Sequence, residues 1–148
     1  ILGSLPGEAS LAARRYYAHP QNQFWALLSP GVGRDLVALG YEARLEALLA
    51  AGVGLWDVVA TARRRGSSDA TIRDITRNDI AELAATLPHL RAIAFNGGTA
   101  RRHGVRQLGE AAERYTLIPL PSSSPLHTVG LAAKATRWSA LAEQLARS

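Results

Sequence analysis

Short apolar runs that end in glycine, proline or serine alternate along this chain with amphipathic stretches of helical length. Residues 92–98 (AIAFNGG) and 115–124 (YTLIPLPSSS) are runs of this kind, and they suit buried strands of a parallel sheet. Residues 1–7 (ILGSLPG) read as the end of a strand that runs into a loop. Strands separated by helices predict an α/β fold, namely a three-layer α/β/α sandwich with a short, mainly parallel central sheet. Such sheets place their ligand-binding loops at the carboxyl ends of the strands.

The helical stretches are predicted from their periodicity and from their start and stop residues. The clearest is residues 41–51, whose leucines lie on one face. Pro20 suits the first turn of a second helix, and Asn78 is the N-cap candidate of a third. The secondary structure of the glycine-bounded apolar run at residues 52–59 stays open. Besides residues 41–51, the predicted helices span residues 8–17, 20–28 (the helix of Pro20), 77–88 (the helix of Asn78) and 136–146.

A chain of 148 residues is the size of one domain, so we expect residues 1–148 to form a single domain. Its first residue, Ile1, is not an initiating Met and stands inside an apolar strand, so we expect the N-terminal start to be truncated. With 47% apolar and 20% charged residues, the chain is predicted to be globular. No apolar run approaches the roughly 20 residues that cross a bilayer, and we expect a cytoplasmic protein without a membrane partner.

Charge and composition limit the cofactors and favour a polyanionic partner. Cysteine is absent and the four histidines show no ligand-like pairing, so we expect no metal and no other cofactor. The net charge of +5 suits a partner rich in phosphate. Sixteen of the seventeen basic residues are arginine, and a GC-rich coding background is the simpler explanation for that bias.

Candidate functional positions begin with a loop and a carboxylate. Residues 3–7 (GSLPG) can bring backbone N–H groups close to an anion or a flat ligand, although a turn of this kind is structural more often than functional. Asp57 stands inside an apolar run, where a carboxylate must be paired, functional or turned to the surface.

Aromatic residues and one amide gather at residues 16–25 (YYAHPQNQFW). Aromatic faces beside an amide can hold a nucleobase by stacking, which contributes about 1–3 kcal/mol per base. Tyr17 and Asn22 are the functional candidates, because a junction between loop and helix usually lies near the surface. Trp25 is predicted to be a core residue.

Residues 120–127 (LPSSSPLH) place three hydroxyls between two prolines at a strand end. Hydroxyls and loop N–H groups of this kind hold phosphate oxygens, although a plain turn has the same composition and is the simpler interpretation of the segment alone. A serine hydrolase is a weaker alternative, because the chain has no GxSxG elbow and His127 stands too close to the serines in sequence.

Taken in order, these segments resemble the motif set of the uracil-DNA glycosylase superfamily, over nearly the whole chain. Residues 3–7 resemble its first motif, and residues 17–25 resemble its base-pocket segment. Residues 54–58 (GLWDV) resemble the segment that contacts the base edge, and residues 120–127 resemble the second motif, which grips DNA. The ordered combination is far more specific than any one segment.

The third residue of the first motif separates the branches of this superfamily. Uracil-directed members carry Asp there and mismatch-directed members carry Asn, whereas this chain has Leu5, which has no polar atom to activate water. The hypoxanthine-DNA glycosylase branch resembles this chain in having an apolar residue there, with GS.PG..SL, YY..P.N.FW and WD in the same order. In that branch catalysis is attributed to the Asn of the N.FW segment, so the resemblance implies Asn22 as the catalytic residue.

The resemblance also implies roles for the other segments. Tyr17 would stack on the flipped base, and Asp57 or Asn96 would contact its polar edge. Leu126 falls where the superfamily places the apolar wedge that fills the hole left in the duplex. The implied base pocket consists of Gly3, Ser4, Leu5, Pro6, Gly7, Tyr17, Phe24, Asp57 and Asn96. The implied DNA-binding residues, of which the serines would pinch phosphates, are Ser122, Ser123, Ser124, Pro125 and Leu126.

The chain is therefore predicted to be a DNA-repair glycosylase that flips a deaminated base out of DNA and hydrolyses its N-glycosidic bond, leaving an abasic site. Hypoxanthine is the favoured base, and xanthine and uracil stay open. Two alternatives also stay open, a uracil- or mismatch-specific glycosylase of the same superfamily and a non-catalytic DNA- or nucleotide-binding module on the same fold. We expect DNA with a deaminated base as the partner, and a monomeric enzyme.

Overall fold

The computed structural model describes residues 1–4, 10, 12, 15–63, 73–125 and 130–146, with only the backbone of residues 59–63 and 73–77. The helix predicted over residues 8–17 falls mostly outside this description. The described strands are β1 (Leu2–Gly3), β2 (Trp56–Asp57), β3 (Val59–Arg63), β4 (Arg73–Arg77), β5 (Ala92–Asn96) and β6 (Thr116–Leu120). The described helices are α2 (Phe24–Val32), α3 (Tyr41–Ala51), α4 (Ile80–Ala85), α5 (Gly98–Leu108), the 3-10 helix η2 (Gly109–Arg114), α6 (Leu131–Trp138) and α7 (Ala140–Ala146).

Four parallel strands form the central sheet in the order β2-β1-β5-β6. β5 and β6 pair along their full length, from Ala92 beside Thr116 to Asn96 beside Leu120. β1 pairs with β2 on one side and with β5 on the other. Because all four strands run in the same direction, their carboxyl ends meet at one edge of the sheet.

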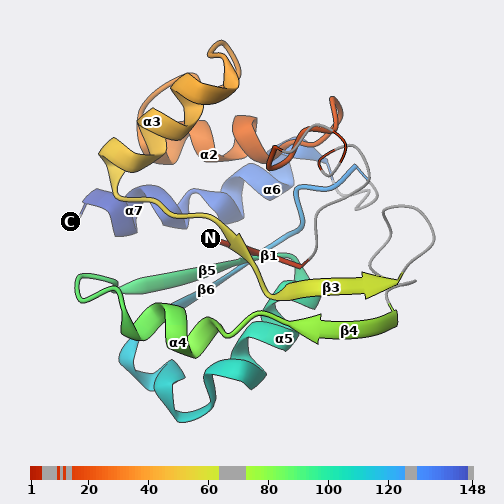
Figure 1. Cartoon of the computed structure of the whole chain (residues 1–148). Helices are drawn as coiled ribbons and strands as arrows, with labels where there is room; N and C mark the ends of the chain where they lie inside the picture. The colour runs from red at the N-terminus through yellow and green to blue at the C-terminus, as the bar shows by residue number, and fades with distance from the viewer. Residues whose placement is uncertain (5–9, 11, 13–14, 64–72, 126–129, 147–148) are drawn as a thin grey trace.

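Helices cover both faces of this sheet (Figure 1). α2, α3, α6 and α7 lie over one face, and α4 and α5 lie over the other. Side chains alternate along β5, because successive residues of a strand point to opposite faces. Ala94 packs in a cluster with Phe24 and Trp138, whereas Ile93 and Phe95 pack in a second cluster on the α5 side. The predicted three-layer α/β/α sandwich with a parallel sheet is confirmed.

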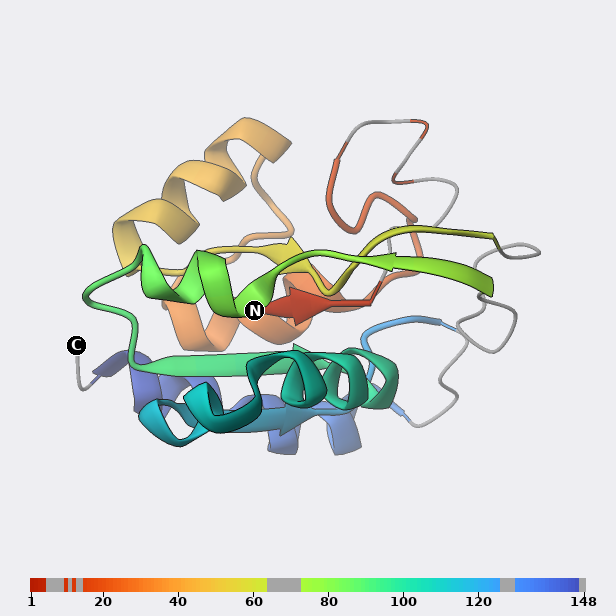
Figure 2. The ribbon, with the colours of Figure 1, turned by 60° about the horizontal axis from the view of Figure 1, so that its bottom comes forward.

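β3 and β4 form an antiparallel hairpin that the sequence analysis did not predict. Their sequences, VATAR and RDITR, place charged or polar residues among the apolar ones, so they lack the continuous apolar run of a buried strand. The open run at residues 52–59 contains β2 and the first residue of β3. Figures 1 and 2 show the hairpin projecting past the carboxyl end of β1.

The predicted helix over residues 41–51 is confirmed as α3. α2 begins at Phe24 instead of near Pro20, because the backbone N–H of Phe24 donates to the side-chain oxygen of Asn22 at 2.9 Å. This bond satisfies one of the N–H groups that a helix start leaves without an intrahelical partner. Trp25 in the first turn is buried, as predicted for a core residue.

Two other predicted helix boundaries were wrong. The N-cap of α4 is Asp79, whose carboxylate accepts the N–H of Glu82, whereas Asn78 donates its side chain to the carbonyl of Asp57 at 2.7 Å. The predicted single helix over residues 136–146 is two helices, α6 and α7, which meet at Ser139. α5 was not predicted, because its two glycines lower its helix propensity. No described helix combines the length and apolar character that a bilayer crossing needs.

Two glycines of α5 provide a matched test of this packing. A Cβ at Gly104 would lie 2.4 Å from a ring carbon of the fully buried Phe95, whereas a Cβ at Gly98 would meet nothing within 4 Å. We expect Gly104→Ala to lower the free energy of unfolding by about 1–3 kcal/mol through overpacking. Gly98→Ala should leave it unchanged or raise it by up to about 1 kcal/mol through helix propensity. Urea denaturation of both variants measures the difference, and equal stabilities would contradict this packing.

Candidate functional site

Polar residues meet at the carboxyl edge of the sheet. Ser4 follows β1, Asp57 ends β2 and Asn96 ends β5, and all three are buried. The loop after β6 reaches the same edge, because Ser123 bonds to Asn96. The structure thus brings together the strand ends that the sequence analysis selected.

Three side chains form a continuous hydrogen-bonded chain at this edge. The amide nitrogen of Asn96 donates to the hydroxyl of Ser123 at 2.9 Å, and that hydroxyl donates to the amide oxygen of Asn22 at 2.8 Å. The backbone N–H of Ser123 donates to the amide oxygen of Asn96 at 2.9 Å. The chain fixes Asn22, which precedes α2, against the end of β5.

The contacts of Ser123 bear on its predicted role in DNA binding, which stays a prediction. Its side chain is 1% exposed, and its hydroxyl, N–H and carbonyl are all bonded to Asn22, Asn96 or the N–H of Gln23. A group with every donor engaged inside the protein has none left for a phosphate. Ser122 and Ser124 are half-buried and Pro125 is exposed, so their predicted contacts with DNA stay predictions.

Close packing of the loop after β6 depends on Gly97. Its φ of 97° lies in the left-handed region that favours glycine, and a Cβ there would come within 3.2 Å of the Cβ of Ser122. The N–H of Gly97 also donates to the carbonyl of Leu120 at 3.0 Å, which extends the pairing of β5 and β6 into the loop.

Tyr17 and Phe24 stack with their ring centroids 3.8 Å apart and an interplanar angle of 15°. Phe24 is fully buried and also makes edge contacts with Trp25 and Trp138. Tyr17 is half-buried and has a left-handed backbone, with φ of 53°. Phe24 therefore belongs to the core and supports the ring of Tyr17, and its predicted place in the base pocket stays a prediction.

The side chain of Asp57 can lie close to β1 because Gly3 has no side chain. A Cβ on Gly3 would lie 2.6 Å from a carboxylate oxygen of Asp57 and 2.9 Å from the hydroxyl of Tyr17. Burial raises the pKa of Tyr16, and the charges of Asp57 and Tyr41 raise it further. The carboxylate of Asp57 and the hydroxyl of Tyr17 thus both lie beside Gly3 at this edge.

A buried lysine, which the sequence analysis did not select, supports the same loop. The ammonium of Lys134 donates to the side-chain oxygen of Gln23 at 2.9 Å and to the carbonyl of Ser124 at 3.2 Å. The side chain is 1% exposed, and burial lowers its pKa. Lys134 is the single lysine among seventeen basic residues, and the other sixteen are arginine. A lysine where the chain otherwise uses arginine is the sequence feature that could have marked this position.

Four predicted site residues lie outside the described residues, namely Leu5, Pro6, Gly7 and Leu126. Their roles stay predictions. Within the described part of the chain, no cluster of three or more histidine or carboxylate side chains could hold a metal ion.

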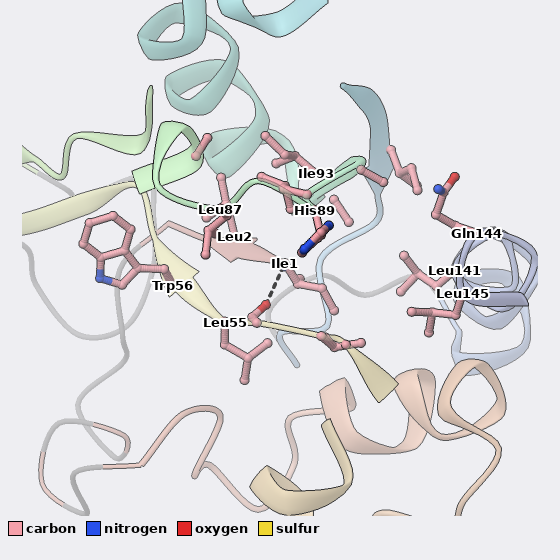
Figure 3. Close-up of a pocket in the computed structure, with 18 of the residues that line it drawn as sticks. Ile1, Leu2, Leu55, Trp56, Leu87, His89, Ile93, Leu141, Gln144 and Leu145 are labelled. Carbon is pink, nitrogen blue, oxygen red and sulfur yellow. Dashed lines mark hydrogen bonds between the residues drawn. The ribbon is translucent and has the colours of Figure 1, made fainter. Parts of the chain in front are cut away.

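An apolar cavity of about 570 Å³ lies at the other end of the sheet (Figure 3). Ile1, Leu2 and Ile93 line it from the starts of β1 and β5, and Leu141 and Leu145 line it from α7. This cavity contains none of the polar side chains of the strand-end edge. Although ligand sites are often the larger pockets, the polar edge is the better candidate because it holds the groups that can do chemistry.

Comparison with known proteins gives a family and two close relatives. The model of the Uracil DNA glycosylase superfamily matches residues 1–145. A Hypoxanthine DNA glycosylase from Methanosarcina barkeri is 38% identical over 138 residues, covering 93% of this chain and 85% of that protein. Another from Methanosarcina acetivorans is 40% identical over 126 residues, covering 84% and 77%. The solution NMR structure of a candidate uracil DNA glycosylase from Methanosarcina acetivorans has a TM-score of 0.84 and 35% identity, covering 98% of this chain and 88% of that one.

Lys134 offers a test of how the site is held. Lys134→Met keeps most of the buried stem but leaves two oxygen acceptors without their donor, so we expect a loss of about 1–3 kcal/mol in the free energy of unfolding. The matched control is Arg137→Met, which alters an exposed position on the same helix and should stay within about 0.5 kcal/mol. Thermal and urea unfolding measure both variants. A Lys134→Met protein as stable as the control would show that these bonds contribute nothing net.

Proposed function

Because the chain belongs to the Uracil DNA glycosylase superfamily, we propose that it removes hypoxanthine from DNA by hydrolysing the N-glycosidic bond and leaving an abasic site. This proposal is carried by the similarity of the chain to two relatives, both named hypoxanthine DNA glycosylase. The chain aligns with each of them over most of that relative's length. Xanthine and uracil are the alternative bases. We further propose that the chain acts as a monomeric single domain in the cytoplasm.

Asn22 is the proposed catalytic residue. Breaking a glycosidic bond produces an oxocarbenium-like sugar and, here, a departing base with growing negative charge. A neutral amide has no proton-accepting pKa in the useful range, so Asn22 would act by hydrogen bonding to the reacting groups and orienting them, without taking up a proton. Its fixed place beside Ser123 and α2 supports this role, because preorganisation reduces the cost of reaching the reactive geometry.

The target base must leave the duplex before its glycosidic bond can be reached. Unstacking costs a few kcal/mol, and less for a mispaired deaminated base. Tyr17 is the proposed stacking surface for the flipped base, supported from behind by the buried ring of Phe24. The loop with Ser122, Ser124 and Pro125 would hold the neighbouring phosphates.

Asp57 is the proposed reader of the base edge. An ionised carboxylate accepts the ring N–H at N1 that hypoxanthine has and adenine lacks. Asn96 is less suited to this role, because its amide oxygen and one amide hydrogen are already bonded to Ser123. Rejection of adenine would follow because N1 of adenine carries a lone pair in place of a hydrogen, so it offers the carboxylate no hydrogen bond and faces it with a second acceptor.

The proposed function is tested with duplexes that carry one hypoxanthine. Asn22→Ala should lower the single-turnover rate of base release, measured as strand cleavage after alkali, by about 100-fold or more, while DNA affinity is retained. The matched control is Gln144→Ala, which removes a half-buried amide at the apolar cavity on the opposite end. Release of uracil alone would assign the chain to another branch of the superfamily. DNA binding without release of any base by the unaltered protein would favour a binding module.

Discrimination at the base edge is tested with Asp57→Asn, which keeps the size of the side chain and removes its charge. We expect hypoxanthine release to fall about 10- to 100-fold, because a charged hydrogen bond to N1–H is replaced. Asp35→Asn, an exposed substitution, is the control for charge alone. An unaltered ratio of hypoxanthine to adenine release in Asp57→Asn would exclude Asp57 as the reader.

A further inference from the structure

The orientation of the Asn22 amide is determined by a backbone group. The backbone N–H of Phe24 lies 2.9 Å from one terminal atom of the Asn22 side chain. An N–H group can donate and cannot accept, so the atom that faces it must be the amide oxygen, Oδ1. The amide nitrogen, Nδ2, is therefore the other terminal atom.

The same polarity follows from the opposite end of the hydrogen-bonded chain. The backbone N–H of Ser123 donates to Asn96 Oδ1, so Asn96 Nδ2 is the atom that donates to the Ser123 hydroxyl. That hydroxyl then gives its own hydrogen to Asn22 Oδ1. Each donor meets an acceptor along the whole chain, and reversing any amide would place two donors or two acceptors face to face.

The two bonds leave a donor available on Asn22. Oδ1 accepts from Phe24 and from Ser123, which uses both of its lone pairs. Nδ2 makes no hydrogen bond with any described residue. Among described side chains, Trp25 Nε1 is the single buried polar atom that lacks a partner. Because Asn22 Nδ2 also lacks a partner among the described residues but is not such a buried atom, it lies within reach of solvent.

We propose that Asn22 presents Nδ2 as a hydrogen-bond donor to an acceptor atom of the departing base, and that Ser123 and Asn96 are positioning residues that hold this orientation. This inference rests on the proposed function. A donor aimed at water would engage one of its two lone pairs and make the water less nucleophilic, whereas a donor aimed at the base stabilises the negative charge that develops there.

The reaction balances without proton transfer by Asn22. The bond between C1′ and N9 breaks with its electron pair leaving on the base. Water adds to C1′ and releases one proton to solvent, and the departing base takes up one proton from solvent. Asn22 donates a hydrogen bond throughout and remains a neutral amide.

Asn22→Asp tests whether position 22 must donate or accept a hydrogen bond. The variant keeps the shape of the side chain and replaces the donor Nδ2 by a carboxylate oxygen, which accepts. We expect the single-turnover rate of hypoxanthine release at neutral pH to fall about 100-fold or more, as in Asn22→Ala. The rate should recover as the pH falls toward the carboxyl's ordinary pKa of about 3.9, since a protonated carboxyl can donate. An Asn22→Asp enzyme as active as the unaltered protein at neutral pH would overturn the inference. If Asn22→Ala itself retains full release, the catalytic assignment under the proposed function fails instead.

Ser123→Ala tests the positioning chain. The variant removes the hydroxyl that joins Asn96 to Asn22, and we expect the single-turnover rate to fall about 10-fold while the Kd for DNA stays the same. Ser139→Ala, which removes an exposed hydroxyl between α6 and α7, is the control. A weaker Kd with an unaltered rate would indicate a phosphate contact and overturn the positioning role. Should Ser123→Ala not fold, the pH profile of Asn22→Asp still decides the donor assignment.

Discussion

The pair of hydrogen bonds between Asn96 and Ser123 joins the carboxyl end of β5 to the loop that follows β6. Much of the described site depends on this junction. It places the Ser123 hydroxyl against Asn22, and the carbonyl of Ser123 accepts the N–H of Gln23 at the start of α2. Because these groups are buried, losing one partner would leave the others unsatisfied at a cost of about 1–3 kcal/mol each. The junction is therefore a structural constraint as well as part of the site.

The fold supplies this junction through strand direction. β5 and β6 are parallel and in register up to Asn96 and Leu120, so the residues that follow them emerge side by side. The loop after β6 is then held from a second direction, since Lys134 donates to the carbonyl of Ser124 and the indole of Trp138 donates to the carbonyl of Pro121. Both donors come from α6. The sheet thus selects which residues meet, and the helix fixes the path of the loop.

The sequence predicted which segments meet but could not predict the direction of each side chain. Placing Asn96 and the serines at one edge needed only the rule for parallel strands. Whether Ser123 faces inward depends on loop dihedrals that the close approach to Gly97 constrains. Lys134 was missed because its partners are 10 and 111 residues away in the sequence. The hairpin of β3 and β4 was missed because its strands lack a periodic apolar pattern.

Donor and acceptor groups at the site come from different elements, and this separation suits a purine. Hypoxanthine offers a ring N–H, which needs an acceptor such as the Asp57 carboxylate at the end of β2, and ring nitrogens with lone pairs, which need a donor such as Asn22 Nδ2. The barrier to glycosidic cleavage can be lowered either by activating water or by stabilising the departing base. Leu5 has no polar atom for the first route. The amide donor proposed at Asn22 would serve the second, so the apolar residue at position 5 is compatible with catalysis that acts on the leaving group.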